Sequence, residues 1–230
     1  MKILSFDLLP STSSFAKENA LHLPIPCVIS ASEQTLGRGR NGKSFFSPKS
    51  TGLYMTYLCP YPENGGLITP AAALAVTEAL EELAGIKPSI KWVNDIFLNN
   101  KKICGILCEC FERENKKFLC VGIGLNLTTA SFPSDLPLAG SVGIDIDKAL
   151  LIERIISHFE SILSGWSDEK IAGEYSKKML LLDKKITFSI NNRQYEGKAT
   201  GIDENCNLLV NSENEIFRLS SGEISIKDLI

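Results

Sequence analysis

The stretch from Gln34 to Pro48 reads QTLGRGRNGKSFFSP, and three of its residues are glycines interleaved with the cations Arg38, Arg40 and Lys43. Glycine tolerates positive φ and lets a ligand approach the main chain closely. Arginine presents a planar fork of donors that suits phosphate or carboxylate groups. Because the chain as a whole carries a formal net charge of −3, this local excess of cations predicts a loop that closes over an anion.

The same stretch also contains the pattern G-x-G-x-x-G over residues 37–42, which occurs in dinucleotide-binding turns. In those turns the pattern joins a strand directly to a helix. Here residues 32–36 follow the preceding apolar run, and residues 43–48 have no helical pattern. A Rossmann site is therefore not predicted. A flexible surface loop is the plainer alternative, and the alternation of arginine with glycine favours the anion site over it.

Outward from this loop, β-type runs and helical patterns predict an α+β fold with a mixed sheet and packed helices. The expected strands are residues 27–31, 53–58, 90–93 and 96–98, followed by a hairpin of 103–110 with 118–127. The expected helices are residues 11–22, one that begins at Thr69-Pro70 and stops at Gly85, 147–163 and 168–181.

After Asp183 the pattern changes to short β-type runs separated by turn residues. These runs are residues 185–190, 195–201, 207–210, 216–219 and 223–226, which predict a small β-barrel. We therefore expect two domains, a larger one over residues 1–181 and a small all-β one over residues 182–230.

Composition excludes several classes of protein. The chain contains no apolar run of 18 residues and no secretory signal pattern at its start, so no membrane association is expected. Its acidic balance argues against general nucleic-acid binding. Seven cysteines without an export signal predict free thiols in the cytoplasm. Three of them (Cys104, Cys108 and Cys110) share one strand face without a nearby histidine, which favours buried thiols over a metal site.

Further polar and glycine signals lie between residues 91 and 126. The run Lys91-Trp92-Val93-Asn94-Asp95 places a cation, an amide and a carboxylate at a strand end. Asp95 could hold Mg²⁺, since hard cations prefer oxygen ligands, but an Asn-Asp turn fits this spacing equally well. Lys102 precedes an apolar strand, where a lysine is usually a solvated residue. Glycines 105, 122 and 124 lie within strands, which predicts a groove where backbone lies against a slender ligand.

Taken in order, these segments resemble the biotin–protein ligases over nearly the whole chain. The matching segments are Ser11-Thr12, Gln34 with the Gly37–Gly42 loop and Ser47-Pro48, Lys91–Asp95, Lys102–Glu109, Val121–Asn126 and Ser221–Ser225. The resemblance implies a class II synthetase-like catalytic domain and an SH3-like C-terminal barrel. It also implies that biotin and Mg-ATP form biotinyl-5′-AMP, and that biotin is then transferred to a lysine of a biotin carboxyl carrier protein.

The resemblance assigns residues to each substrate. Those implied for biotin are Ser11, Thr12, Ser13, Gln34, Gly37, Arg38, Gly39, Arg40, Lys102, Gly105 and Gly122. Those implied for ATP are Arg38, Arg40, Lys43, Phe45, Lys91, Asn94 and Asn126. The catalytic roles fall to Lys102, Arg38, Arg40 and Asp95, and Asp95 would also face the Mg²⁺ ion.

The chain departs from the family pattern at four positions, where Ser13, Lys43, Phe45 and Val93 replace the more usual Asn, Arg, Trp and Pro. Phe45 would still stack on adenine, but with less area than tryptophan. The chain also has no counterpart of the DNA-binding domain of repressor-type members, so we expect no transcriptional role. Either a monomer or a homodimer is compatible with the sequence.

Three alternative functions fit the sequence less well. A lipoate or octanoyl ligase or transferase has a related fold, but the Gly-Arg loop and the C-terminal Ser-Gly-Glu-Ile-Ser segment favour biotin. A non-catalytic biotin sensor would be expected to lose Lys102 or the arginine pair, and both are present. A phosphate-binding protein with accidental matches would not carry so many motifs in the family order.

Overall fold

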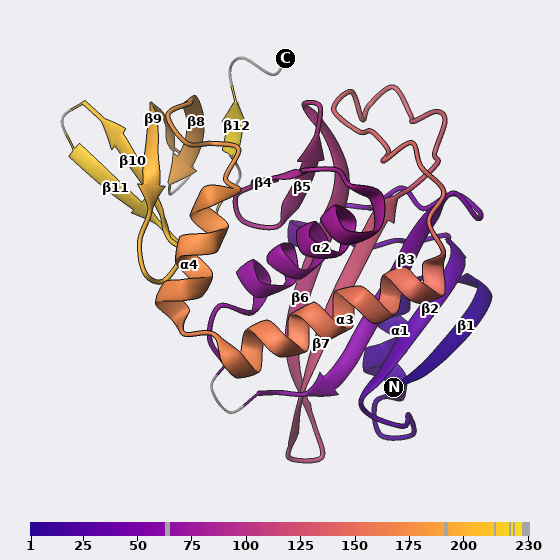
Figure 1. Ribbon diagram of the computed structural model, residues 1–230. Helices are drawn as coiled ribbons and strands as arrows, with labels where there is room; N and C mark the ends of the chain where they lie inside the picture. Colours follow the sequence, from indigo (N-terminus) through magenta and orange to yellow (C-terminus); the bar gives the residue numbers. More distant parts are fainter. Residues whose placement is uncertain (63–64, 191–192, 214, 221, 223, 227–230) are drawn as a thin grey trace.

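A seven-stranded mixed sheet forms the framework of the protein (Figure 1). The computed structural model describes residues 1–62, 65–190, 193–213, 215–220, 222 and 224–226. Within these residues the strand order is β1-β2-β3-β7-β6-β5-β4, and only β1 and β2 pair in parallel. The strands are β1 (Lys2–Leu9), β2 (Cys27–Gln34), β3 (Gly52–Pro60), β4 (Ser89–Lys91), β5 (Asp95–Leu98), β6 (Lys101–Arg113) and β7 (Lys116–Asn126).

Helices cover the two faces of this sheet unequally. Figure 1 shows α2 (Ile68–Ala84) and α3 (Lys148–Gly165) lying across one face, and their apolar residues join Leu53, Val121 and Ile106 of the strands in the main hydrophobic cluster. The short α1 (Thr12–Asn19) packs on the opposite face, in a smaller cluster with residues of β2, β3 and β7. Because α1 covers only part of that face, the remainder is open to the Gly-Arg loop.

The helix boundaries follow from capping residues. Ser11 caps α1 by accepting a hydrogen bond from the Ser14 amide at 3.4 Å, and Asp147 caps α3 by accepting one from the Leu150 amide at 2.8 Å. Gly85 ends α2 in the left-handed conformation, with φ of 66°, as expected from the sequence. The predicted start of α2 at Thr69 is wrong, because the helix already begins at Ile68 and Leu67 occupies the cap position.

The strands after Asp183 form a separate antiparallel sheet. Its order is β11-β10-β9-β8-β12, with bounds β8 (Lys185–Ile190), β9 (Arg193–Ile202), β10 (Leu208–Ser212), β11 (Glu215–Leu219) and β12 (Ile224–Ile226). The predicted small all-β unit is confirmed, but the described residues show no pairing between β11 and β12 that would close a barrel. Ser221 and Glu223 of the Ser-Gly-Glu-Ile-Ser segment lie outside the described residues.

Two elements differ from the sequence prediction. Strand β1 was not predicted, because residues 2–9 combine apolar residues with Lys2, Ser5 and Asp7 without a clear β pattern. Helix α4 (Asp168–Lys177) is shorter than the predicted 168–181. Its chain leaves the helix because the Lys178 carbonyl accepts from the Ile90 amide and the Leu180 amide donates to the Ile90 carbonyl. These residues thereby pair with β4 instead of extending the helix.

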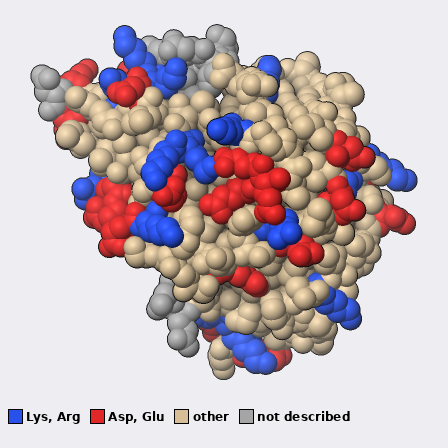
Figure 2. Space-filling view, viewed as in Figure 1, with Lys and Arg blue, Asp and Glu red and all other residues tan. Residues whose placement is uncertain are grey.

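Charged side chains gather on the helical face of the molecule, and Figure 2 shows acidic and basic residues intermixed there. Most of the pairs join different helices: His158 of α3 lies 3.2 Å from Glu78 and 3.1 Å from Glu82 of α2, and Lys178 pairs with Glu81. Burial raises the pKa of Glu78, although His158 and Lys178 oppose the shift. No helix among the described residues has the length and apolar character needed to cross a membrane.

The interface between α2 and α3 provides a test of the fold. Leu80 of α2 is fully buried in the main cluster, whereas Leu150 in the first turn of α3 is 38% exposed. We expect Leu80→Ala to lower the free energy of unfolding by about 3 kcal/mol because it leaves a cavity, and Leu150→Ala to cost less than about 1 kcal/mol. Urea denaturation of both variants measures the difference, and equal effects would contradict the described packing.

Candidate active site

A cavity of about 350 Å³ opens on the sheet face that carries α1. Its floor is formed where β6 pairs with β7, in a register that sets Gly105 opposite Gly124 and Leu107 opposite Gly122. A Cβ atom on Gly122 would lie 2.8 Å from the Ser13 hydroxyl, and one on Gly124 would lie 2.5 Å from the Phe45 ring. Side chains of the protein itself therefore approach the glycine-bearing strands closely, and the groove for a slender ligand stays a prediction.

One end of the cavity is a network of hydroxyl and amide groups at the start of α1. Gln34 Oε1 accepts from the Thr12 amide at 2.9 Å and from the Thr12 hydroxyl at 3.2 Å, and Gln34 Nε2 donates to the Ser47 hydroxyl at 2.9 Å. Thr56 of β3 donates to Thr12 at 2.9 Å and lies 3.2 Å from the Ser13 hydroxyl. These bonds hold the polar groups of α1 and β2 in fixed directions at this end.

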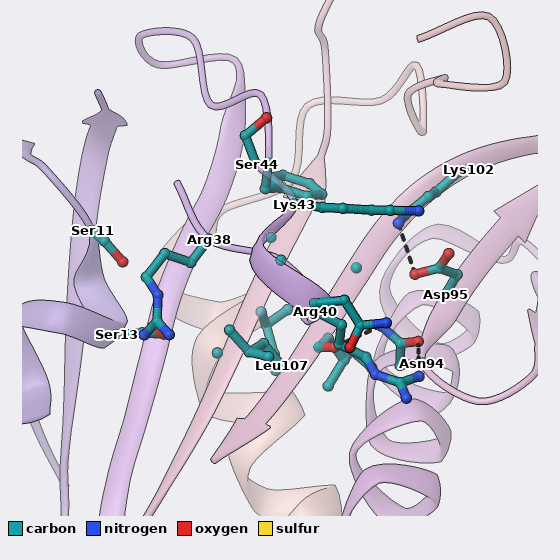
Figure 3. A pocket seen from close by; sticks show the side chains of 18 of the residues that line it. Ser11, Ser13, Arg38, Arg40, Lys43, Ser44, Asn94, Asp95, Lys102 and Leu107 are labelled. Carbon is teal, nitrogen blue, oxygen red and sulfur yellow. Dashed lines mark hydrogen bonds and ion pairs between the residues drawn. The ribbon is translucent and has the colours of Figure 1, made fainter. Parts of the chain in front are cut away.

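The Gly-Arg loop forms a short hairpin over the cavity. The Phe45 amide donates to the Gly37 carbonyl at 2.8 Å and the Gly39 amide donates to the Lys43 carbonyl at 2.7 Å. At the tip, residues 40–42 make a single 3₁₀ turn, in which Asn41 and Gly42 have positive φ. The two arginines lie in different directions from this hairpin: in Figure 3, Arg38 lies on the side of Ser11 and Ser13, and Arg40 lies beside Asn94.

The opposite end of the cavity holds an ordered group of charged and amide side chains (Figure 3). Arg40 Nη1 donates to Asn94 Oδ1 at 3.0 Å, and Asn94 Nδ2 donates to the Ile106 carbonyl at 2.8 Å. Lys102 Nζ lies 2.7 Å from Asp95 Oδ1. This contact is an ion pair whose angles do not fit a hydrogen bond, so the buried Asp95 Oδ1 has no hydrogen-bond partner.

The backbone around Lys102 fixes the position of its side chain. The Lys102 amide donates to the Leu138 carbonyl at 2.7 Å, and the Lys102 carbonyl accepts from the Gly140 amide at 2.9 Å. On its other side, Lys102 is opposite Phe97 of β5 in the sheet. Lysine is a flexible point charge, so this double anchoring of its main chain restricts where the ammonium group can reach.

Charge in the cavity is unevenly distributed. Among the described residues that line it, Asp95 is the only carboxylate, whereas five side chains are cationic (Arg38, Arg40, Lys43, Lys91 and Lys102). Cations that converge on one cavity, with a single acid, favour an anionic ligand. Asp95, whose Oδ1 has no hydrogen-bond partner, also suits a Mg²⁺ ion that arrives on phosphate groups, since such ions take only one or two protein carboxylates.

The C-terminal sheet also reaches the cavity. Trp92 lines it and donates its indole N–H to the Cys206 carbonyl at 2.8 Å, in the turn between β9 and β10. Gly222 and Ile224 line it as well. The turn that presents Cys206 is itself held by Asp203, whose carboxylate accepts from the amides of Asn205 and Asn207.

The structure brings together all of the residues predicted for the site except Gly37 and Asn126. At Gly37 a side chain would meet the Phe45 carbonyl and the Ser47 hydroxyl, so this glycine serves the packing of the hairpin arms. The Asn126 side chain is buried and donates to the Gly140 carbonyl at 3.0 Å, outside the cavity lining.

Sequence analysis missed several lining residues. Leu136 comes from a loop without any recognisable pattern, and Met55 belongs to an apolar strand that predicts only core. Gly124 was named among the glycines of the predicted groove, but the family resemblance assigned it to neither substrate. The cysteine prediction holds only in part: Cys104 is buried, Cys108 is partly buried and Cys110 is exposed. Burial raises the pKa of the Cys108 thiol to about 12, which keeps it protonated at neutral pH.

Two family models match the chain. The model described as the biotin/lipoate A/B protein ligase family matches residues 5–126, and the model described as the biotin protein ligase C terminal domain matches residues 181–227. Among curated proteins, the bifunctional ligase/repressor BirA of Bacillus subtilis (strain 168) is 32% identical, over 97% of this chain and 74% of its own length. The biotin–[acetyl-CoA-carboxylase] ligase of Mycobacterium tuberculosis is 24% identical, over 86% of this chain and 77% of its own length.

Solved structures agree with these matches. The biotin protein ligase from Aquifex aeolicus in complex with biotin and ATP superposes with a TM-score of 0.83 at 28% identity, covering 98% of both chains. The first family model spans more than half of the chain, and the C-terminal match is specific to biotin ligases. The chain therefore belongs to the biotin/lipoate A/B protein ligase family, as a biotin protein ligase.

Proposed function

We propose that this chain activates biotin with ATP as biotinyl-5′-AMP and then transfers it to a lysine of a biotin carboxyl carrier protein. The observation that carries the proposal is one continuous cavity, which joins a hydroxyl and amide network at one end to a cluster of cations at the other. The first end suits the uncharged polar head of biotin, and the second suits its carboxylate together with phosphate groups. Its volume lies within the usual range for small-molecule sites.

The first step brings two anions together. An oxygen of the biotin carboxylate attacks the α-phosphorus of ATP, the bond from this phosphorus to the bridging oxygen breaks, and pyrophosphate leaves. The carboxylate is already ionised at pH 7, so the step needs no general base. Catalysis then depends on positioning and on neutralising charge, which Lys102 and Arg40 supply from fixed positions. ATP enters as its Mg²⁺ complex, and Asp95 would hold the ion.

In the second step, the amine of the acceptor lysine attacks the acyl carbon and AMP leaves as the bond to its phosphate oxygen breaks. The amine must lose a proton, and Asp95, whose buried Oδ1 has no hydrogen-bond partner, would accept it. Asp95 would therefore orient Lys102 before the first step and receive a proton in the second.

Several finer features belong to the same proposal. We assign residues 1–181 to a catalytic domain and residues 182–230 to a small C-terminal domain. The free thiols support a cytoplasmic location. The acidic net charge supports activity on a carrier protein without nucleic-acid binding. The protein would act as a monomer or a homodimer.

The function is tested by incubating the protein with Mg-ATP, a biotin carrier domain and either biotin or lipoate. We expect transfer of biotin alone, and Lys102→Ala should lower its rate by about 10²–10³-fold because a fixed cation at the developing charge is lost. Lys101→Ala is the matched control, since the Lys101 ammonium instead contacts the Pro137 carbonyl. Transfer of lipoate in place of biotin, or an unaffected Lys102→Ala, would contradict the proposal.

The role of Asp95 in the second step is tested with preformed biotinyl-AMP, which bypasses adenylation. We expect Asp95→Asn to slow transfer to the carrier by about 10²-fold near neutral pH, because no group then accepts the proton of the amine. The loss should shrink as the pH rises and the acceptor lysine deprotonates by itself. Asp135→Asn, in an exposed loop, is the control. Equal transfer rates for the variant and the wild type would remove Asp95 from this step.

Phe45 is expected to contact the adenine. Its ring lies over Gly105 and Gly124 and is 6.5 Å from the Tyr54 ring, so it forms an aromatic wall of the cavity. We expect Phe45→Ala to raise the KM for ATP by about three- to tenfold and Phe45→Trp to lower it, with little change in the KM for biotin. Phe46→Ala is the control, because Phe46 contacts Phe132 outside the cavity. Steady-state kinetics of pyrophosphate release measure both constants, and an unchanged KM for ATP in Phe45→Ala would contradict the role.

A further inference from the structure

Glu109 of β6 joins two cations from separate elements, and nothing in the function proposed above uses it. Its Oε1 accepts from Lys17 of α1 at 2.8 Å and from Arg38 Nη2 at 2.9 Å, and its Oε2 accepts from Arg38 Nη1 at 3.0 Å. The bond to Arg38 is therefore bidentate, the geometry in which arginine and a carboxylate pair most strongly and with the most defined orientation. Three elements meet at this one side chain: α1, β6 and the Gly-Arg hairpin.

The pair lies at the rim of the active site and is partly shielded from water. Gly105, Leu107 and Glu109 alternate along β6, so they face the same side of the sheet, and the first two line the cavity. The side chains of Lys17, Arg38 and Glu109 are 24%, 37% and 21% exposed. Burial alone would raise the pKa of Glu109, but hydrogen bonds and charge from Lys17 and Arg38 outweigh it and lower the pKa, which keeps the carboxylate ionised at neutral pH.

Two side-chain contacts thus hold the hairpin at separate points, in addition to the bond from the Leu36 amide to the Pro10 carbonyl at its base. Arg38 pairs with Ser44 across the hairpin arms and is fixed by Glu109 on the side of Ser11 and Ser13 (Figure 3). Arg40, at the tip, is fixed by Asn94 on the side of Lys102. Because different residues hold these two points, loss of the Glu109 contact would free the Arg38 side chain and loosen the arm next to the hydroxyl network. The contact at the tip would stay in place.

We propose that Glu109 is a positioning residue: it fixes Arg38, and through Arg38 the first arm of the hairpin, over the biotin end of the cavity. This inference rests on the proposed function for the identity of the ligand at that end. It gives Arg38 a role in holding the loop, in place of the phosphate contact expected from the sequence. Charge at the phosphate end then comes from other side chains, Arg40 and Lys102 among them.

A glutamine at position 109 keeps the shape of the side chain and removes its charge. In Glu109→Gln the bidentate pair is lost, and Lys17 and Arg38 face each other without an anion between them. We expect the KM for biotin to rise about tenfold while the KM for ATP changes by less than about twofold. Glu112→Gln, the same change at an exposed position on the same strand, should leave both constants unchanged.

A double-mutant cycle identifies the partner. If Glu109 acts through Arg38, the variant that combines Arg38→Gln with Glu109→Gln should raise the KM for biotin no more than either single change does. Lys17→Met removes the other cation but keeps the bidentate pair, and it should leave the KM for biotin within about twofold of the wild type. Additive effects, an equal rise from Lys17→Met, or a rise mainly in the KM for ATP would overturn the proposal.

A second measurement does not depend on catalysis and so separates this proposal from the proposed function. In the ligand-free protein, trypsin should cleave the loosened arm after Arg38 several-fold faster in Glu109→Gln than in the wild type or in Glu112→Gln. Thermal unfolding of the three proteins shows whether the change stays local. Equal cleavage rates would overturn the positioning role even if the wild type attaches biotin, and faster cleavage would support it even if the ligand proved to be another acid.

Discussion

The register between β6 and β7 is the constraint on which the site depends. It places Gly105 opposite Gly124 and Gly122 opposite Leu107, so one patch of the sheet presents almost no side chains. A slip of one residue would turn these glycines toward α2 and α3 and fill the patch with the larger residues between them. Those larger residues, Ile106, Val121 and Ile123 among them, are buried in the main cluster. The packing of the helical face thereby keeps the opposite face open.

The distribution of charged side chains also differs between the two faces of the sheet. On the helical face, acids and bases pair with one another between α2, α3 and their neighbours. On the cavity face, cations outnumber acids among the described lining residues, and the strongest contacts orient those cations without burying them completely. Asn94 links two parts of the site, because it bonds to Arg40 through one atom and to Ile106 through two others. Because these side chains are already oriented, they need to move little when an anion binds.

Much of this arrangement could be predicted from the sequence, because local signals agreed with the global fold. The capping residues Ser11, Asp147 and Gly85 fixed helix ends, and the Gly-Arg and Lys-Trp-Val-Asn-Asp motifs located most of the cavity. The failures have a common cause, since they involve pairing partners distant in the sequence. Strand β1 is stabilised by its ladder with β2, and α4 ends where the chain meets Ile90. Leu136 and Glu109 acquire their positions only through tertiary contacts that no spacing rule describes.

The hydrogen bond from Trp92 to the Cys206 carbonyl has a consequence for how such a protein can change over time. An indole donor buried in the active site finds its acceptor in the small sheet, 114 positions further along the chain. In a chain that lost the C-terminal sheet or carried a different one, the buried indole N–H would have no acceptor. This would lower the free energy of unfolding by about 1–3 kcal/mol. The catalytic sheet and the C-terminal sheet should therefore be inherited together. Recombination between related genes should keep the turn around Asp203 together with Trp92, whose indole N–H donates to the Cys206 carbonyl in that turn.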